Sequence, residues 1–206
     1  LKVHKVLSTP TDYSNGIYDG IDHMIKLGQV SPNSVKHLVH ASTVATNTII
    51  TRTGAKVGLI TTVGFRDVLE IGRLRYPRLY DMNWDKPTAL VPRYLRLVVH
   101  ERIDYTGKIT VPLKMNSVRS AIKNLLSHNV ESIAVCLLNS YVNPKHEQMI
   151  SDYLTKKYPK IKLSISSDIL KEIKEYERTS TTVINAYIKP VIEHYISNLE
   201  KRLKQS

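Results

Sequence analysis

The chain has 206 residues, 42% hydrophobic and 23% charged, which is typical of a soluble globular protein with one sizeable α/β domain or two small ones. No apolar run approaches the ~20 residues that cross a bilayer, which disfavours a membrane protein. The single cysteine excludes an internal disulfide framework and fits a reducing cytoplasm. The formal net charge of +12 is evenly spread, with 14 basic and 8 acidic residues in 1–103 and 16 and 10 in 104–206. This even spread, without a basic tail, disfavours nucleic acid as a partner and leaves an acidic partner protein open.

Strand-like and helical runs alternate in the first half of the chain. The predicted elements are a strand over 2–7, a helix capped by Ser14 and ended by Gly28, a strand over 35–41, a helix over 44–52 followed by the C-cap glycine Gly54, a strand over 56–61 and a short helix over 65–71 ended by Gly72. The first residue is Leu1 rather than Met, inside the first predicted strand. We therefore expect a truncated or processed product.

The second half begins after a long irregular connection, residues 73–93, whose basic, tyrosine-rich opening lies at 73–80. The predicted elements are then a hairpin of 97–103 with 108–111, a helix over 117–128, an apolar strand over 133–138, a helix over 144–158, a strand over 161–165, and a long closing helix containing Pro190. Strands that alternate with helices, one of them apolar on both faces, predict an α/β fold whose sheet is covered by helices on both sides.

The most informative stretch is His40–Asn47, where polar residues crowd the start of a helix that directly follows a predicted strand. Ser42, Thr43, Thr46 and Asn47 lie within six positions there. Free backbone N–H groups and the helix dipole favour negative charge at a helix N-terminus. The pattern predicts a site for a phosphate or a carboxylate, and the alternative is an ordinary N-cap.

A second polar run, Glu175–Thr182, opens the closing helix. Arg178 can pair with a carboxylate or phosphate, and Thr179 adds a hydroxyl; the alternative is a capping box with a surface ion pair. No histidine or cysteine spacing typical of a metal site, Gly-rich phosphate loop or serine nucleophile elbow is present. We predict no metal ligands, and we expect the runs at 42–47 and 178–181 to share one cavity for negatively charged groups.

Together these strings resemble the N-terminal region of the hydantoinase A/5-oxoprolinase family, to which the large subunits of acetone-type carboxylases are related. The resemblance runs in order along nearly the whole chain, and the strings that carry it are Lys5–Pro10, His40–Asn47, Gly54–Thr62, Gly64–Arg73, Lys86–Pro87, Leu90–Arg93, Glu101–Asp104, Ile133–Leu138, Glu175–Thr182 and Asn185–Tyr187. The chain departs from the family at Ala41, where a glycine is usual, and at Leu74 and Tyr76, where polar and basic residues are usual.

By this resemblance, residues 1–206 form a mixed α/β sheet belonging to part of an actin/hexokinase-like (ribonuclease H-like) ATPase domain. The complete protein would use ATP and Mg²⁺ to phosphorylate the amide oxygen of a cyclic amide, such as hydantoin, N-methylhydantoin or 5-oxoproline, which water then opens. The family's first phosphate-binding strand and turn, of the Asp-Gly-Gly-Thr type, are not in these 206 residues, so we expect an N-terminal fragment that is inactive alone. The implied partners are the C-terminal remainder of the protein and a hydantoinase B-type subunit.

The resemblance places the predicted substrate-binding residues around one cleft. They are Ser42, Thr43, Thr46, Asn47, Arg73, Arg178 and Thr179. The catalytic base and the exact substrate stay undefined. Three alternatives remain: a related ketone carboxylase subunit, a module that binds nucleic acid or an acidic partner, and a purely structural subunit.

Overall fold

The computed structural model describes residues 3–7, 9, 12–28, 31–73, 81, 83 and 86–204. The chain divides into two compact units, described separately below. The first unit comprises residues 1–53 and 191–206, and the second comprises residues 54–190. The sequence pattern itself gives no clear boundary between them.

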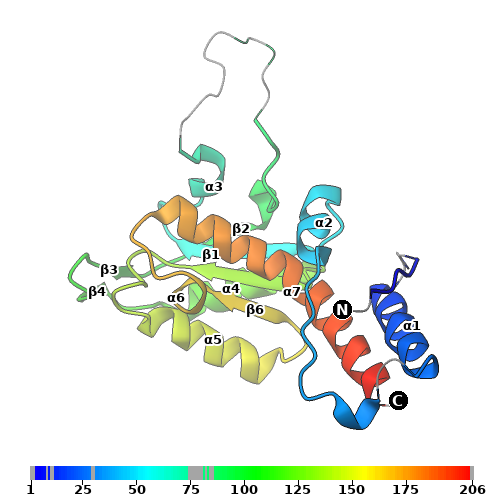
Figure 1. The fold of residues 1–206 in the computed structure, drawn as a ribbon. Helices are drawn as coiled ribbons and strands as arrows, with labels where there is room; N and C mark the ends of the chain where they lie inside the picture. Colours follow the sequence, from blue (N-terminus) through cyan, green and yellow to red (C-terminus); the bar gives the residue numbers. More distant parts are fainter. Residues whose placement is uncertain are drawn as a thin grey trace. The chain divides into compact units, whose positions relative to one another are not determined.

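A four-stranded parallel sheet forms the centre of the second unit (Figure 1). Its strands are β1 (Val57–Thr62), β2 (Arg96–Val99), β5 (Ser132–Cys136) and β6 (Lys162–Ile165), in the order β2-β1-β5-β6. All residues of β1 and β5 are buried. This two-sided burial explains their continuous apolar sequence, because the central strands of a parallel sheet are covered on both faces.

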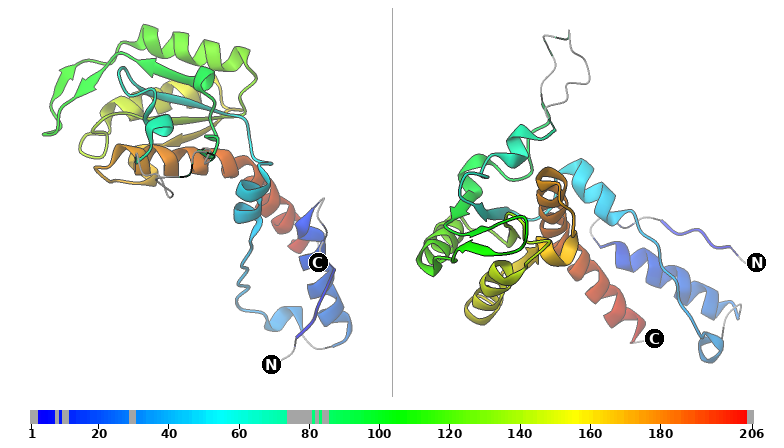
Figure 2. Two further views of the ribbon diagram at one scale, coloured as in Figure 1. Left: turned by 90° about the horizontal axis from the view of Figure 1, so that it is seen from above. Right: turned by 90° about the vertical axis from the view of Figure 1, so that its left-hand side faces the viewer.

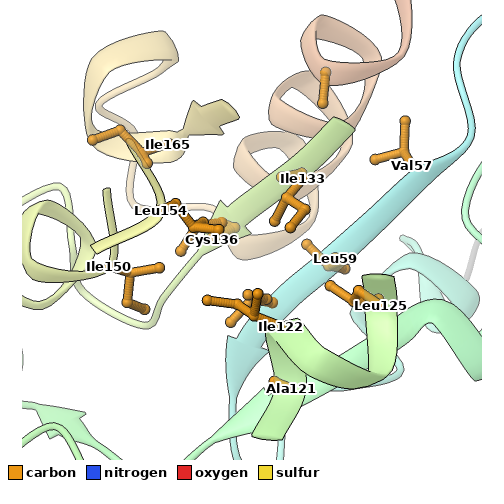
Figure 3. Packing of buried hydrophobic residues seen from close by; sticks show 14 of the residues in the cluster. Val57, Leu59, Ala121, Ile122, Leu125, Ile133, Cys136, Ile150, Leu154 and Ile165 are labelled. Atoms are coloured by element: carbon orange, nitrogen blue, oxygen red, sulfur yellow. The ribbon is translucent and has the colours of Figure 1, made fainter. Parts of the chain in front are cut away.

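Helices cover both faces of this sheet, so the predicted α/β class is confirmed. Helix α4 (Met115–Ser127) lies in the connection from β2 to β5, and α5 (Lys145–Lys157) lies in the connection from β5 to β6. Helix α7 (Glu175–Leu203) lies on the opposite face of the sheet (Figures 1 and 2). In the core, Leu125 of α4 lies against β1 (Figure 3). On the other face, the thiol of Cys136 accepts a hydrogen bond from Thr179 of α7 at 3.2 Å. Gly58 leaves room for α4, because a Cβ at this position would lie 2.6 Å from Leu125 Cδ2.

The predicted hairpin is only partly correct. The run 97–103 divides into β2, which joins the parallel sheet, and β3 (Arg102–Ile103), which pairs antiparallel with β4 (Ile109–Val111) in a separate two-stranded sheet. Gly107 turns the hairpin with φ +88°, as predicted for its left-handed position. Short elements complete the unit: α3 (Val68–Ile71), η2 (Arg93–Leu95) and α6 (Ser166–Ile169).

The first unit holds α1 (Tyr13–Lys26), η1 (Pro32–Ser34), α2 (Val44–Thr51) and the last part of α7. The predicted helices are confirmed, but their caps differ. Asp12, not Ser14, caps α1, accepting a hydrogen bond from the Ser14 N–H at 3.0 Å. Arg52, with φ +55°, ends α2 in place of Gly54, whose missing Cβ instead admits the Tyr187 ring.

The strands predicted over 2–7 and 35–41 are wrong for the residues that the structure describes. Residues 3–7 and 35–41 pair with no strand, and their side chains are exposed. A strand needs a neighbouring backbone to satisfy its N–H and C=O groups, and the described part of the chain offers these two segments none. Within the long connection 73–93, residues 74–80, 82, 84 and 85 lie outside the described residues.

Candidate functional site

The start of α2 borders a hollow of about 500 Å³ within the first unit. One wall comes from Val6 and Leu7, another from the segment around His40 and Ser42. The remaining lining residues come from the turn after the first segment, α1, the start of α2 and α7: Thr9, Tyr13, Gly16, Ile17, Ala41, Thr43, Val44, Asn47 and Tyr195. Its volume lies within the range of small-molecule sites, and the hollow is open to solvent.

Three of the four polar residues predicted at this helix mouth line the hollow: Ser42, Thr43 and Asn47. Ser42 Oγ accepts a hydrogen bond from the Val44 N–H at 3.1 Å, which satisfies one free donor of the helix. Thr43 stands at the N-cap position but makes no side-chain cap bond, so its hydroxyl faces no competing helix donor. The helix mouth thus presents hydroxyl and amide groups to one shared space.

Thr46 is exposed and does not line this hollow. A second hollow of about 470 Å³ lies in the same unit, and Asn47 lines both hollows. Its walls include Thr48, Thr51 and His194. Of the predicted site residues, Asn47 therefore borders both of these hollows.

Arg178 and Thr179 lie in the second unit and are buried, with exposed fractions of 1% and 3%. The Arg178 guanidinium donates to the Leu137 carbonyl at 2.8 Å and to Ser140 Oγ at 2.9 Å, and it stacks over the Tyr141 ring. These contacts tie α7 to the end of β5, although Arg178 Nε has no partner among the described residues. Their predicted role in substrate binding stays a prediction, as does a cavity shared with residues 42–47.

Arg73, the remaining predicted residue, forms an ion pair with Glu177 and keeps half of its side chain exposed. Backbone hydrogen bonding together with the Arg73 guanidinium holds the pKa of Glu177 below its ordinary value. The pair joins the segment after α3 to the first turn of α7. Nothing in these contacts brings Arg73 to an enclosed space.

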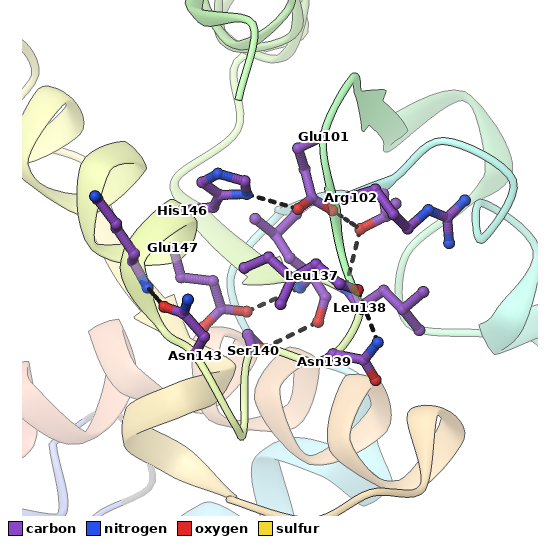
Figure 4. Close-up of polar contacts among 12 residues, drawn as sticks. Glu101, Arg102, Leu137, Leu138, Asn139, Ser140, Asn143, His146 and Glu147 are labelled. Atoms are coloured by element: carbon purple, nitrogen blue, oxygen red, sulfur yellow. Dashed lines mark hydrogen bonds and ion pairs between the residues drawn. The ribbon is translucent and has the colours of Figure 1, made fainter. Parts of the chain in front are cut away.

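Sequence reasoning missed a buried polar network at the carboxyl end of the parallel sheet (Figure 4). Glu101, just after β2, accepts hydrogen bonds from Thr62 Oγ1 and from His146 Nδ1, the latter at 2.7 Å. Thr62 Oγ1 in turn accepts from the Leu138 N–H at 2.9 Å, which joins the ends of β1 and β5. These hydrogen bonds join groups within the protein, so the network holds the strand ends in a fixed geometry.

Glu147, in the first turn of α5, forms the second part of this network. Its carboxylate accepts from the Leu137 N–H at 2.8 Å, Ser166 Oγ at 2.7 Å and the Ser167 N–H at 2.8 Å, and the residue is fully buried. Each hydrogen bond to a buried carboxylate offsets part of the cost of removing its charge from water. The position of polar residues directly after strands was the only sequence signal for this network.

The strand order places a topological switch point between β1 and β5, since the chain passes from β1 to β2 on one side and later to β5 and β6 on the other. Open α/β sheets bind ligands outside the carboxyl ends of their strands at such a point. In this sheet, the hydrogen bond between Leu138 N–H and Thr62 Oγ1 lies at the switch point. Gly64, two residues after Thr62, has φ +91° and open space around the position of a Cβ.

The fold and the hollow define an α/β protein in which polar groups at a helix N-terminus border an open hollow. The family described as the hydantoinase/oxoprolinase N-terminal region matches residues 1–158. The chain belongs to this family, as the resemblance in its sequence predicts.

Known relatives agree with this membership. The chain is 37% identical to an uncharacterized protein of Methanocaldococcus jannaschii over 98% of its own length and 30% of that protein's. It is 32% identical to the caprolactamase subunit alpha of Pseudomonas jessenii, and it covers 30% of the crystal structure of that ATP-dependent caprolactamase with a TM-score of 0.88. A nucleotide-free structure of acetone carboxylase matches with 28% identity and a TM-score of 0.82, over 96% of this chain and 30% of that one. The chain thus spans about 30% of the length of these relatives.

Proposed function

We propose that the chain is the N-terminal part of an ATP-dependent cytoplasmic enzyme that opens a cyclic amide. The observation that carries the proposal is the likeness, over 99% of the chain, to an enzyme whose name states both ATP dependence and a lactam substrate. The remaining part of the enzyme would lie outside these residues, in further polypeptide and in a second, hydantoinase B-type subunit. Relatives named as alpha and beta subunits support that arrangement.

In this proposal, the mouth of α2 holds the substrate. Thr43 and Asn47 offer a hydroxyl and an amide to the hollow, and the helix N-terminus adds partial positive charge. These groups suit a carbonyl oxygen that gains negative charge during reaction. Ser42 fixes the first turn of the helix and thereby orients the other two.

The donor groups here do not fit a resident Mg²⁺ ion. The described residues that line the hollow at the mouth of α2 include no Asp or Glu, whereas a protein site for Mg²⁺ supplies one or two carboxylates. We therefore assign no role in phosphoryl transfer to the residues of this hollow. Its own residues would bind and orient the substrate.

The test uses the complete enzyme that carries this chain, with Asn47→Ala and Thr43→Ala. We expect each variant to lower kcat/KM for the cyclic amide roughly five- to tenfold, the effect of losing one substrate hydrogen bond. The unfolding midpoint should stay unchanged. Ile50→Ala is the matched control, because Ile50 lies on the same helix with 73% exposure and lines neither described hollow. Unchanged kcat/KM in both folded variants would remove the proposed site.

A carboxylase is the second candidate, favoured by the TM-score of 0.82 with acetone carboxylase. Amide opening consumes ATP with a cyclic amide, whereas carboxylation consumes ATP with a ketone and bicarbonate. Incubating the complete enzyme with ATP and a panel of hydantoin, 5-oxoproline and caprolactam, and separately with acetone and bicarbonate, distinguishes them. ATP hydrolysis stimulated only by the ketone with bicarbonate would replace the amide-opening proposal.

A further inference from the structure

His40 and Tyr195 meet at the wall of the hollow in the first unit. His40 lies two residues before Ser42, and Tyr195 belongs to the last part of α7. The Tyr195 hydroxyl is hydrogen-bonded to His40 Nε2, and the two rings pack with their centroids 5.7 Å apart. Both residues line the hollow, so the fold brings an imidazole ring to the space in which the proposed substrate binds.

The two members of this pair differ in their contact with water. Tyr195 is buried, with an exposed fraction of 6%, whereas His40 is exposed. The Tyr195 hydroxyl engages one nitrogen of the imidazole, and His40 Nδ1 has no hydrogen-bond partner among the described residues. A hydrogen bond to one ring nitrogen of a histidine orients the ring and decides which nitrogen is left for a ligand. In this pair, Tyr195 holds the ring and Nδ1 is the nitrogen left for a ligand.

His40 is also the group of this wall that can exchange a proton near neutral pH. Histidine changes charge between about pH 5 and 8, whereas tyrosine does so only well above neutral pH. The other titratable groups among the described lining residues are Tyr13 of α1 and Tyr195 of α7, and those lining residues include no Asp, Glu, Lys or Arg. A proton needed by a substrate in the hollow would therefore come from His40.

We propose, resting on the function proposed above, that His40 is the general acid of amide opening and that Tyr195 is its positioning residue. Water bonds through its oxygen to the carbonyl carbon and releases a proton to the solvent. The ring C–N bond breaks, and its electron pair stays on the nitrogen. That nitrogen takes up the Nδ1 proton of the His40 imidazolium and so leaves as a neutral group. Solvent then returns a proton to His40, which its exposure allows.

The first test measures the pH dependence of kcat for cyclic-amide opening by the complete enzyme and its His40→Gln variant. We expect His40→Gln to lower kcat at least about a hundredfold with little change in KM. In the wild type, kcat should fall as the pH rises from about 6 to 8, because the imidazolium is the donating form, and this fall should vanish in the variant. His37→Gln is the matched control, since His37 is exposed, lies three residues earlier and does not line the hollow. A folded His40→Gln enzyme that keeps its kcat or the same fall would overturn the proposal.

The second test replaces the imidazole from solution, which a merely structural role for His40 would not permit. The hollow is open to solvent, so added imidazole can enter the space that His40→Ala vacates. We expect imidazole to raise kcat of His40→Ala at least about tenfold and to leave Asn47→Ala unchanged. Equal effects of imidazole on the two variants would contradict proton transfer by His40.

The third test separates the positioning role of Tyr195 from the chemistry of His40. Tyr195→Phe keeps the ring and removes the hydroxyl, so kcat should fall about tenfold while its decline with rising pH persists. Loss of that decline in Tyr195→Phe would assign the proton to the tyrosine instead. A wild-type enzyme that opens no cyclic amide would remove the proposed function together with this assignment. Amide opening that survives undiminished in His40→Ala would remove the assignment alone.

Discussion

Single polar residues in this chain act mainly by fixing helix and strand ends. Asp12 is an example, since it caps α1, accepts hydrogen bonds from Ser14 N–H and Oγ at 3.0 and 2.6 Å, and lies 3.5 Å from Arg202. These Ser14 hydrogen bonds, with the Arg202 charge, hold the pKa of Asp12 below its ordinary 3.8. The ionised carboxylate is therefore the form that stabilises the helix.

Replacing Asp12 by alanine should lower the free energy of unfolding by about 1 kcal/mol at pH 7. Because the folded pKa is lowered, the contribution is fully present above about pH 4 and is lost as the pH falls through the folded pKa. The difference between wild type and Asp12→Ala, measured by urea unfolding from pH 7 to pH 3, should shrink accordingly. Asp12→Asn keeps a capping oxygen but does not titrate, so its deficit relative to wild type should be smaller than that of Asp12→Ala and should also shrink toward pH 3, whereas the difference between the two variants should stay the same at every pH.

The elements of the second unit follow from patterns that sequence reasoning can detect. The buried strands β1, β5 and β6 and the helices α4, α5 and α7 were all predicted within a few residues. Their apolar periodicity is local and strong. The hairpin was misjudged because the run 97–103 serves two sheets, and the two N-terminal strands failed because pairing depends on a backbone that the described residues do not contain.

The candidate site shows the same division. The polar cluster at Ser42, Thr43 and Asn47 was predictable, since it requires only a helix start with polar residues. The Glu101–Thr62–Leu138 network was not, because its members come from three elements and meet only in the folded sheet. The carboxyl end of β1 joins Leu138 through one threonine hydroxyl, a contact that composition and spacing do not reveal.

Close packing between β1 and α4 gives a prediction at the level of elements. Gly58→Ala should lower the free energy of unfolding by about 1–3 kcal/mol, because the added Cβ would lie 2.6 Å from Leu125 Cδ2. Leu125→Ala alone should cost about 2–5 kcal/mol. In the double variant the cost of Gly58→Ala should largely disappear, and denaturant unfolding of the four proteins measures this coupling. If the two free-energy costs simply add, α4 moves away from the added methyl group, and the contact with Leu125 is not the source of the Gly58→Ala cost.

Under the proposed function, the whole molecule is one part of a larger enzyme. Its long helix α7 contributes residues to both compact units, and no helix of the described residues has the length and apolarity that would let it cross a membrane. Relatives are about three times as long as the segment they share with this chain. Activity should accordingly be a property of the assembled enzyme.

We therefore expect the 206-residue chain alone to show no ATP hydrolysis above background, with or without a cyclic amide. A coupled assay for ADP release, run beside the complete enzyme at equal molar concentration, measures this. The chain must be folded in the assay, which far-ultraviolet circular dichroism establishes. Turnover by the folded chain alone would mean that it holds the nucleotide itself and would shift the catalytic centre into these residues.

Cys136 gives the protein an internal reporter of its own opening. It is the chain's single thiol, it is 2% exposed, and burial raises its pKa above the ordinary value. Alkylating reagents attack the thiolate, so modification should proceed only through molecules whose central sheet has opened. The rate of alkylation of Cys136 would then report how often β5 separates from α7, without introduced dyes or engineered cysteines.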